Sequence, residues 1–309
     1  MQKKIPVIID CDPGIDDSFA LLYALNSTKL DVLCVVSVAG NVSLRMTTSN
    51  ACNLLANIVS TVPVYAGSES PLNGNPLQAK FDHGVCGLGK YEFKENKLSN
   101  FVDGDGIEKV SQTIQQSDQP VTILALGPLT NIAKLIQTYP QVLYNVKEII
   151  IMGGGVTKGN YTKYAEFNIL SDPLAANIVF QSGVSCKIVP LETTESCRFN
   201  KEFFIKISQS SSIKAQLLTS IINTNTSISS MSKQDGWWIH DMIAAVVLTN
   251  PEFFEFEPMI VDVQTKATAT IGQTVFKQQL FSNNNPNCYL VTTNKAEMIK
   301  NHACHVLTQ

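Results

Sequence analysis

The chain has 309 residues, of which 44% are hydrophobic and 16% are charged, and its formal net charge is −3. This length and composition predict a folded protein with a large core and exclude a disordered chain. The small negative charge gives no electrostatic reason to expect binding to nucleic acid or to an anionic membrane. No run of about 18 apolar residues occurs, so no membrane span is predicted.

The amino end and the cysteines both favour a cytoplasmic protein. After Lys3 and Lys4, the apolar run Ile5–Ile9 is interrupted by Asp10, so it is too short for a signal peptide. The eight cysteines form no C-x-x-C pair, and several of them, such as Cys11, lie within apolar segments. We therefore expect reduced thiols that pack as small hydrophobic side chains.

Short runs rich in Val and Ile predict the strands of a parallel sheet. These runs lack the alternation of strands with one exposed face, so helices are expected to cover both faces of the sheet. The predicted strands are Ile5–Ile9, Val32–Val38, Val121–Ala125, Ile149–Met152 and Cys186–Pro190.

Segments with apolar residues at helical spacing lie between these strands. One of them begins with Asp172 as N-cap and Pro173 at the first helical position, and it extends to Gly183. Repeated strand–helix units predict an α/β fold with an open, mostly parallel, Rossmann-like sheet and helices on both faces. The other predicted helices are Asp17–Asn26, Met46–Ser60 and Asp103–Gln116.

The pattern changes after about residue 200, but no domain linker or internal repeat occurs. We therefore predict a single domain over residues 1–309, in which residues 66–100 form a long active-site loop or lid. The later predicted elements are a helical region Lys201–Ser232 broken by the polar run Ser208–Ser212, a helix from Ile239 or His240 to Leu248, strands Pro258–Gln264 and Tyr289–Thr292, and a loop Ser282–Asn287.

A cluster of acidic residues follows the first predicted strand. Asp10, Asp12, Asp16 and Asp17 lie within eight residues, where binding sites form in open α/β sheets. A helix N-terminus would account for two of these carboxylates, but four crowded negative charges raise one another's pKa. A bound cation removes this conflict. Because the cluster offers only carboxylate oxygens, it favours calcium or magnesium over zinc.

A phosphatase motif is the main alternative interpretation of this segment. The spacing Asp10-x-Asp12 after a strand also resembles the nucleophile box of haloacid-dehalogenase-type phosphatases. That family has Thr or Val where Gly14 stands, and its pattern lacks the pair Asp16-Asp17. The alternative therefore explains less of the segment than a metal site does.

The whole pattern Asp10-x-Asp12-x-Gly14-x-Asp16-Asp17 resembles the signature of the inosine–uridine-preferring nucleoside hydrolases. The resemblance implies the nucleoside hydrolase fold and extends over about 230 residues. Further matches follow in the family's order: Gly40-Asn41, His83-Gly84 with Gly87-Leu88-Gly89, Gly127-Pro128-Leu129-Thr130-Asn131, Met152-Gly153-Gly154-Gly155, Gly159-Asn160, Glu166-Phe167-Asn168 with Asp172-Pro173, and His240-Asp241.

The resemblance also implies a calcium site and two catalytic residues. Asp12, Asp17 and Asp241 would hold Ca²⁺ together with the backbone carbonyl of Leu126, and water and ribose hydroxyls would complete the coordination. Asp12 would act as the general base, and His240 would protonate the leaving base. A single histidine near apolar residues is more often structural, so the role of His240 depends on its place beside Asp241.

A further set of residues would contact the ribonucleoside. Polar side chains would hold the ribose hydroxyls, and an indole would stack on the base. By themselves Asn160, Glu166 and Asn168 are also compatible with an ordinary polar loop and a helix cap, and one tryptophan with a core position. The expected contact residues are Asp16, Asn41, His83, Met152, Asn160, Glu166, Phe167, Asn168, Trp237 and Trp238.

The sequence departs from the family pattern near the base. Ser232 and Ile228 stand where some relatives have Arg and Tyr, eight and twelve residues before His240, and Val85-Cys86 stands where Glu-Ser is common. The preferred base therefore stays open.

The predicted function is calcium-dependent hydrolysis of ribonucleosides to ribose and free nucleobase, in nucleoside salvage. The alternatives are a hydrolase of another N-ribosyl compound, such as nicotinamide riboside, and a non-catalytic calcium- and ribose-binding homologue. The resemblance also implies a homodimer or homotetramer.

Overall fold

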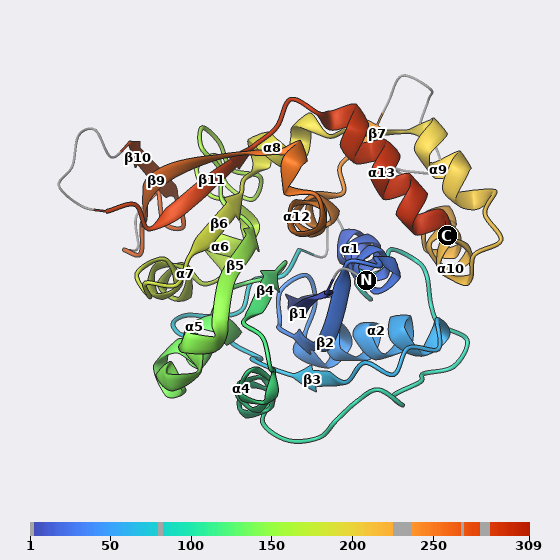
Figure 1. Cartoon of the computed structure of the whole chain (residues 1–309), viewed down its shortest axis with the longest axis horizontal. Helices are drawn as coiled ribbons and strands as arrows, with labels where there is room; N and C mark the ends of the chain where they lie inside the picture. The colour runs from blue at the N-terminus through green and yellow to red at the C-terminus, as the bar shows by residue number, and fades with distance from the viewer. Residues whose placement is uncertain (1–2, 80–82, 225–235, 267–268, 279–284) are drawn as a thin grey trace.

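The structure is a computed structural model that describes residues 3–79, 83–224, 236–266, 269–278 and 285–309, and these fold around a nine-stranded sheet. The strands are β1 (Ile5–Cys11), β2 (Leu30–Ser37), β3 (Val64–Ala66), β4 (Val121–Ala125), β5 (Val146–Met152), β6 (Cys186–Val189), β9 (Glu255–Val263), β10 (Thr274–Gln278) and β11 (Cys288–Thr292). Their order across the sheet is β10-β9-β11-β6-β5-β4-β1-β2-β3 (Figure 1). In the described part of this sheet, β9 pairs antiparallel with β10 and with β11 and the other pairs are parallel, so the sheet is mostly parallel as predicted.

Helices cover both faces of the sheet. They are α1 (Ile15–Asn26), α2 (Leu44–Asn57), α4 (Gly106–Gln116), α5 (Thr130–Thr138), α6 (Phe167–Ser171), α7 (Pro173–Phe180), α8 (Leu191–Ser196), α9 (Lys201–Ser208), α10 (Ile213–Thr224), α12 (His240–Thr249) and α13 (Ala296–Thr308), with 3₁₀ turns η1 (Pro140–Asn145) and η2 (Pro251–Phe253). The α1, α12 and α13 helices lie on one face, and α4, α5 and α7 lie on the other (Figure 1).

The two faces bury separate apolar cores, and β1 contributes to both. Val7, Ile9 and Cys11 point into the core under α1 and α12, whereas Ile8 points into the core under α4 and α5. Successive side chains of a strand alternate between faces, so a strand covered on both sides is apolar throughout. The prediction that Cys11 belongs to the core, although it lies between two aspartates, is confirmed.

The five predicted parallel strands are all present, and β4 has the predicted bounds. The predicted region Lys201–Ser232 is divided into α9 and α10, and α9 ends at Ser208, where the polar run begins. Residues 225–232 of that region and 282–284 of the predicted loop lie outside the described residues. The late strands β9 and β11 and the helix α12 are confirmed, whereas β3, β10, α5 and α13 were not predicted.

Asp172 caps α7 as predicted, because its Oδ1 accepts a hydrogen bond from the Ala175 N–H at 3.0 Å. The helix ends at Phe180, before the predicted end at Gly183. The other carboxylate oxygen accepts from Thr130 Oγ1 and from the Leu72 N–H, both at 2.7 Å. This buried side chain therefore joins α7, α5 and the start of the 66–100 loop.

The carboxyl ends of the central strands meet at one point. Asp10 of β1 pairs with Ala125 of β4, and Cys11 pairs with Ser37 of β2. Because β1 lies between strands reached by connections in opposite directions, this point is the topological switch of the sheet. The loops after β1, β2 and β4 therefore leave the sheet side by side.

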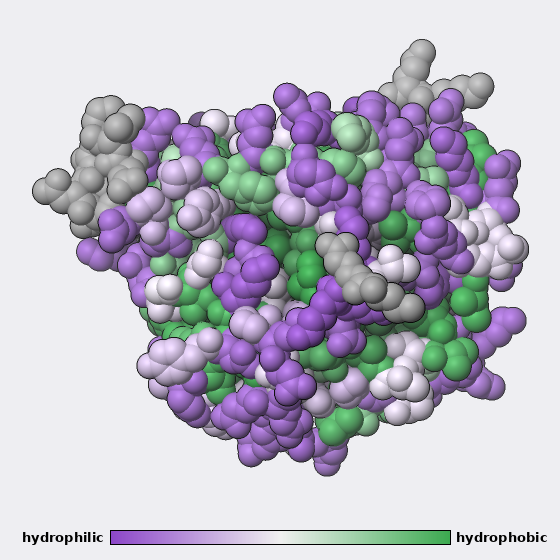
Figure 2. Space-filling view, viewed as in Figure 1, coloured by the Kyte–Doolittle hydropathy of each residue, from purple (hydrophilic) through white to green (hydrophobic). Residues whose placement is uncertain are grey.

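The surface and the thiols agree with the composition. Hydrophilic side chains are spread over the face seen in Figure 2, with apolar patches between them. All eight cysteines are free, and six of them are buried, as expected for reduced thiols packed as hydrophobic groups. Among the residues that the structure describes, no helix is long and apolar enough to cross a membrane.

Candidate active site

A cleft of about 430 Å³ opens at the carboxyl edge of the sheet. This volume is in the range of small-molecule binding sites, roughly 300–1,000 Å³. The cleft brings together every residue predicted for the site except Asp17, which is buried directly behind it. The lining residues are Asp12, Asp16, Asn41, Ala79, His83, Leu126, Met152, Asn160, Glu166, Phe167, Asn168, Glu195, Trp237, Trp238, His240 and Asp241.

Three carboxylates form a compact cluster at the floor of this cleft. Asp16 and Asp17 lie in the first turn of α1, Asp241 lies in the first turn of α12, and one oxygen from each lies within 4.8 Å of the others. Two helix N-termini therefore meet here, and their dipoles favour negative charge. Asp12 lies beside the cluster, with its N–H 3.2 Å from Asp17 Oδ1. The compact group contains Asp16, which was predicted to bind ribose, in place of Asp12.

Burial and mutual repulsion disfavour the ionised forms of these carboxylates. Burial raises the pKa of Asp17 to about 7, and the charge of Asp16 adds to the effect. Burial also raises the pKa of Asp12 and of Asp241 well above the usual range, with further contributions from neighbouring aspartates. The described lining contains no lysine or arginine that would offset this charge.

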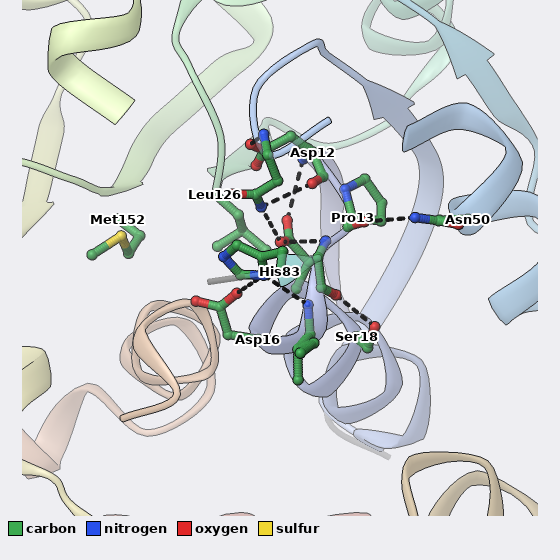
Figure 3. A network of polar contacts seen from close by, with 12 residues as sticks. Asp12, Pro13, Asp16, Ser18, Asn50, His83, Leu126 and Met152 are labelled. Atoms are coloured by element: carbon green, nitrogen blue, oxygen red, sulfur yellow. Dashed lines mark hydrogen bonds and ion pairs between the residues drawn. The ribbon is translucent and has the colours of Figure 1, made fainter. Parts of the chain in front are cut away.

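The donor set fits a hard divalent cation. The candidate ligands are carboxylate oxygens and the Leu126 carbonyl, which are the ligands that calcium prefers. Asp16 Oδ1 is buried without a hydrogen-bond partner among the described residues, and His83 Nδ1 lies 3.8 Å from it (Figure 3). A cation would supply the missing partner and remove the repulsion between the buried carboxylates.

Two glycines leave room for the carboxylate of Asp12. A Cβ at Gly40 would lie 2.1 Å from Asp12 Oδ2, and a Cβ at Gly127 would lie 2.7 Å from Oδ1. Real Cβ atoms do not approach other atoms so closely, so only glycine leaves room for this carboxylate. The N–H of Asn41, next to Gly40, donates to Asp12 Oδ2 at 2.7 Å. The space that the Asp12 carboxylate needs therefore explains why the motifs Gly40-Asn41 and Gly127-Pro128 begin with glycine.

We expect Gly40→Ala to lower kcat at least about tenfold, because the new methyl group displaces the Asp12 carboxylate from its position. The measurement is kcat on a ribonucleoside together with the thermal midpoint of unfolding. The matched control is Gly183→Ala, where a Cβ meets no atom within 4 Å but φ is +80°. The control should lower the thermal midpoint and leave kcat unchanged, and a wild-type kcat for Gly40→Ala would contradict the steric role.

Asn41 and His83 extend the polar network around the cluster. The Asn41 amide donates to the Asp12 carbonyl at 3.0 Å and to Asp17 Oδ2 at 3.2 Å. His83 Nδ1 lies 3.2 Å from the Ile15 N–H, which donates to it (Figure 3). His83 and Ala79 belong to residues 66–100, so the predicted active-site loop reaches the cleft. Its closure over a substrate stays a prediction.

Glu166 is both a helix cap and a residue of the cleft. Its Oε1 accepts from the Asn168 N–H at 3.0 Å, and its Oε2 accepts from the N–H groups of Gly154 and Ile169 at 2.9 and 3.2 Å. Burial raises the pKa of Glu166 to about 7, although these hydrogen bonds oppose the shift. Asn160 Oδ1 accepts from the Phe167 N–H at 2.9 Å. The helix-cap interpretation is therefore correct and coexists with a place in the cleft.

Asn168 joins the strand ends at the back of the cleft. Its amide donates to the carbonyls of Leu126 at 2.8 Å and Met152 at 3.1 Å. A carbonyl oxygen has two lone pairs, so the Leu126 oxygen keeps one acceptor position for a cation. Asn168 thereby orients the one backbone group predicted as a metal ligand.

The loop between β5 and α6 is held from two sides. Gly155 exchanges two hydrogen bonds with Thr274 on β10: its N–H donates to Oγ1 at 3.1 Å, and its carbonyl accepts from Oγ1 at 2.7 Å. On the other side, Glu192 of α8 accepts from the N–H groups of Val156 and Thr157 at 2.9 and 2.8 Å. An ion pair between Lys158 and Glu195 adds a further connection to α8.

Two neighbouring tryptophans line the cleft. Trp237 lies on the short strand β8 (Gly236–Trp237), which pairs with β7 (Phe199–Asn200), and it packs against the core. Trp238 is 36% exposed, donates from Nε1 to the Glu195 carbonyl at 3.0 Å, and carries the Arg198 guanidinium 5.0 Å above its ring. Positions 228 and 232, where some relatives have Tyr and Arg, lie outside the described residues.

Glu195 and Thr194 were missed by the sequence analysis. Both lie on α8, which directly follows β6 at the carboxyl edge of the sheet. A short polar helix after a predicted strand is the signal that would have drawn attention to them. Thr194 Oγ1 lies 2.6 Å from His240 Nδ1, at the start of α12.

Comparisons with known proteins agree with this arrangement. The sequence profile described as "Inosine-uridine preferring nucleoside hydrolase" matches residues 7–301. A non-specific ribonucleoside hydrolase (RihC) of Klebsiella pneumoniae is 35% identical over 272 residues, which cover 88% of each chain. A plant nucleoside hydrolase, PpNRh1, has a TM-score of 0.87 at 28% identity over 99% of each chain, and a purine-preferring ribonucleoside hydrolase from Gardnerella vaginalis shares the fold with a TM-score of 0.89 at 21% identity over 98% of each chain. The chain therefore belongs to the inosine–uridine-preferring nucleoside hydrolase family, whose members hydrolyse N-glycosidic bonds.

Proposed function

We propose that the protein hydrolyses the N-glycosidic bond of ribonucleosides in a calcium-dependent reaction that yields ribose and free nucleobase. The observation that carries the proposal is the composition of one cleft. An oxygen-only acidic cluster, several amide and carboxylate side chains and two tryptophans converge there at the switch point of the sheet. The acidic cluster suits a cation, the amide and carboxylate side chains suit the hydroxyls of a sugar, and the tryptophans suit a flat base.

Asp12, Asp17, Asp241 and the Leu126 carbonyl would hold the calcium ion, and Asp16 adjoins them. When bound, Ca²⁺ supplies electrostatic stabilisation and makes water in the site more acidic. Asp12 accepts the proton from the attacking water, and the Asn41 N–H holds its carboxylate in the space that Gly40 and Gly127 leave. We propose direct attack by water on the sugar, without a covalent intermediate, as in inverting glycosidases.

The remaining residues position the substrate and activate the leaving base. Polar side chains around the floor of the cleft hold the ribose hydroxyls, and these contacts tighten as the sugar ring flattens in the transition state. His240 protonates the departing base, and Trp237 and Trp238 stack on it. The proposed ribose-binding residues are Asp16, Asn41, Asn160, Glu166 and Asn168, with His83, Met152 and Phe167 beside the sugar and base.

A substrate panel tests this function. Purified protein with added calcium is incubated with inosine, uridine, cytidine, adenosine and nicotinamide riboside, and the released reducing sugar is measured. We expect turnover of at least one of the four nucleosides. Turnover of nicotinamide riboside alone would favour the other N-ribosyl hydrolase, and nucleoside binding without turnover would favour a non-catalytic homologue.

Metal removal should abolish the activity. Because all candidate ligands are oxygens and the carboxylates repel one another without a cation, we expect prolonged chelation to remove turnover and lower the thermal midpoint of unfolding. Added Ca²⁺ should restore both, and Mg²⁺ is the matched control for ion size. Full activity in exhaustively metal-free protein would contradict the proposed site.

Two broader properties are proposed with this function. Eight free cysteines, six of them buried, support a cytoplasmic enzyme of nucleoside salvage. We expect a homodimer or homotetramer, which sedimentation analysis would test.

A further inference from the structure

The hydroxyl of Thr194 lies between a backbone carbonyl and the imidazole of His240. Thr194 is fully buried on α8 and is not part of the cleft lining. Its Oγ1 donates to the Leu191 carbonyl at 3.1 Å and lies 2.6 Å from His240 Nδ1. The threonine therefore contacts the imidazole from behind, whereas the ring itself lines the cleft.

The two contacts of the Thr194 hydroxyl can both be hydrogen bonds with only one placement of the hydrogens. A hydroxyl has one hydrogen and two lone pairs. With its hydrogen on the Leu191 carbonyl, Thr194 Oγ1 accepts a hydrogen bond from Nδ1–H of His240. The two ring nitrogens flank Cε1 and their N–H directions diverge, so a ring held at Nδ1 turns Nε2 away from Thr194, and this ring lines the cleft.

The other histidine of the cleft is held in the opposite way. His83 Nδ1 accepts the Ile15 N–H at 3.2 Å, so the hydrogen of the neutral His83 ring is on Nε2. A backbone amide and a buried hydroxyl thus select different tautomers at the two rings. Only the His240 arrangement leaves a ring that keeps its hydrogen on Nδ1 after Nε2 has given one away.

We propose that Thr194 is a positioning residue for leaving-group protonation, an inference that rests on the proposed function. As the C1′–N bond breaks, its electron pair goes to the base nitrogen, which takes the Nε2 hydrogen of the imidazolium form of His240, in which both ring nitrogens carry hydrogen. Water supplies hydroxide to C1′ and its remaining proton to Asp12. The neutral His240 left behind carries hydrogen on Nδ1, and this is the tautomer that Thr194 holds.

The experiment removes the hydroxyl and preserves the rest of the helix. We expect Thr194→Val to lower kcat roughly 10- to 100-fold on the ribonucleoside that the wild type turns over fastest, with little change in KM, because a misplaced catalytic ring loses rate more than binding. Thr194→Ser keeps the hydroxyl and should restore kcat to within about threefold of the wild type. Thr194→Ala removes the hydroxyl a second way, should Thr194→Val not fold.

Two comparisons separate positioning from a structural role. On p-nitrophenyl riboside, whose leaving group needs no proton, Thr194→Val should retain nearly all of its kcat. In a His240→Ala background, Thr194→Val should cause no further loss, because the residue acts only through that ring.

The proposal is overturned if Thr194→Val and Thr194→Ala keep the wild-type kcat, if Thr194→Ser loses as much as they do, or if the loss is equal on both substrates. It is also overturned if the loss persists in the His240→Ala background. The proposed function has its own test, since it fails only if the wild type itself releases no ribose from ribonucleosides.

Discussion

Replacing Asp12 with alanine should lower kcat at least about 10³-fold. The change removes the proposed general base and one proposed calcium ligand together, and the remaining carboxylates cannot take its place between Gly40 and Gly127. The measurement is steady-state hydrolysis of a ribonucleoside at saturating calcium, with calcium affinity determined in parallel. Both values should fall.

The matched control for this substitution is Asp262→Ala. Asp262 is an aspartate on β9 whose side chain is 44% exposed and pairs with Lys277, so the control makes the same substitution outside the cleft. The control should keep the wild-type kcat. If Asp12→Ala retained more than a tenth of wild-type kcat, another residue would have to be the base.

Replacing His240 with alanine should slow ribonucleoside hydrolysis roughly 10²- to 10⁴-fold. A nucleobase leaves poorly as an anion, so the loss of its proton donor acts directly on the breaking bond. The nitrophenolate of p-nitrophenyl riboside leaves readily without a proton. The same variant should therefore lose far less activity on that substrate, since Asp12 and the acidic cluster remain.

The matched control here is His305→Ala, an exposed histidine on α13 that does not line the cleft. Its kcat should equal that of the wild type on both substrates. Equal losses of His240→Ala on the two substrates would show that His240 supports the metal site or the fold. Leaving-group activation would then have to come from elsewhere, for example from stacking on Trp237 or Trp238.

Local patterns predicted the central part of the fold and the acidic site. The run Ile5–Ile9 of β1 is apolar on both faces, and the aspartates begin with Asp10 at the end of the strand, so both features can be read from neighbouring positions. The positions of Asp241 and Asn168 followed from ordered motif matches and a family resemblance. In the structure, Asn168 and Asp241 line the same cleft although they are far apart in the sequence.

The features that were missed depend on tertiary packing. β10 is an edge strand, and α13 packs on α1 and α9, so neither has a strong local signal. Thr194 carries no chemical signature of its own, because its role comes from a hydrogen bond to a residue 46 positions away. In the same way, the spacing of the aspartates predicted a cluster near the end of β1. It did not show that Asp16, rather than Asp12, belongs to the compact group with Asp17 and Asp241.

The hydrogen bonds between Thr274 and Gly155 connect an edge strand outside the cleft to a loop that carries residues of the cleft. Within the described residues, none after Asp241 lines the cleft, yet the edge strand β10 holds the loop that carries Asn160 and Glu166 through two hydrogen bonds. A chain shortened before β9 would keep every described lining residue and lose this brace. The antiparallel edge of the sheet therefore holds the loop of two proposed ribose-binding residues from outside the cleft, and we expect substitutions there to alter substrate affinity.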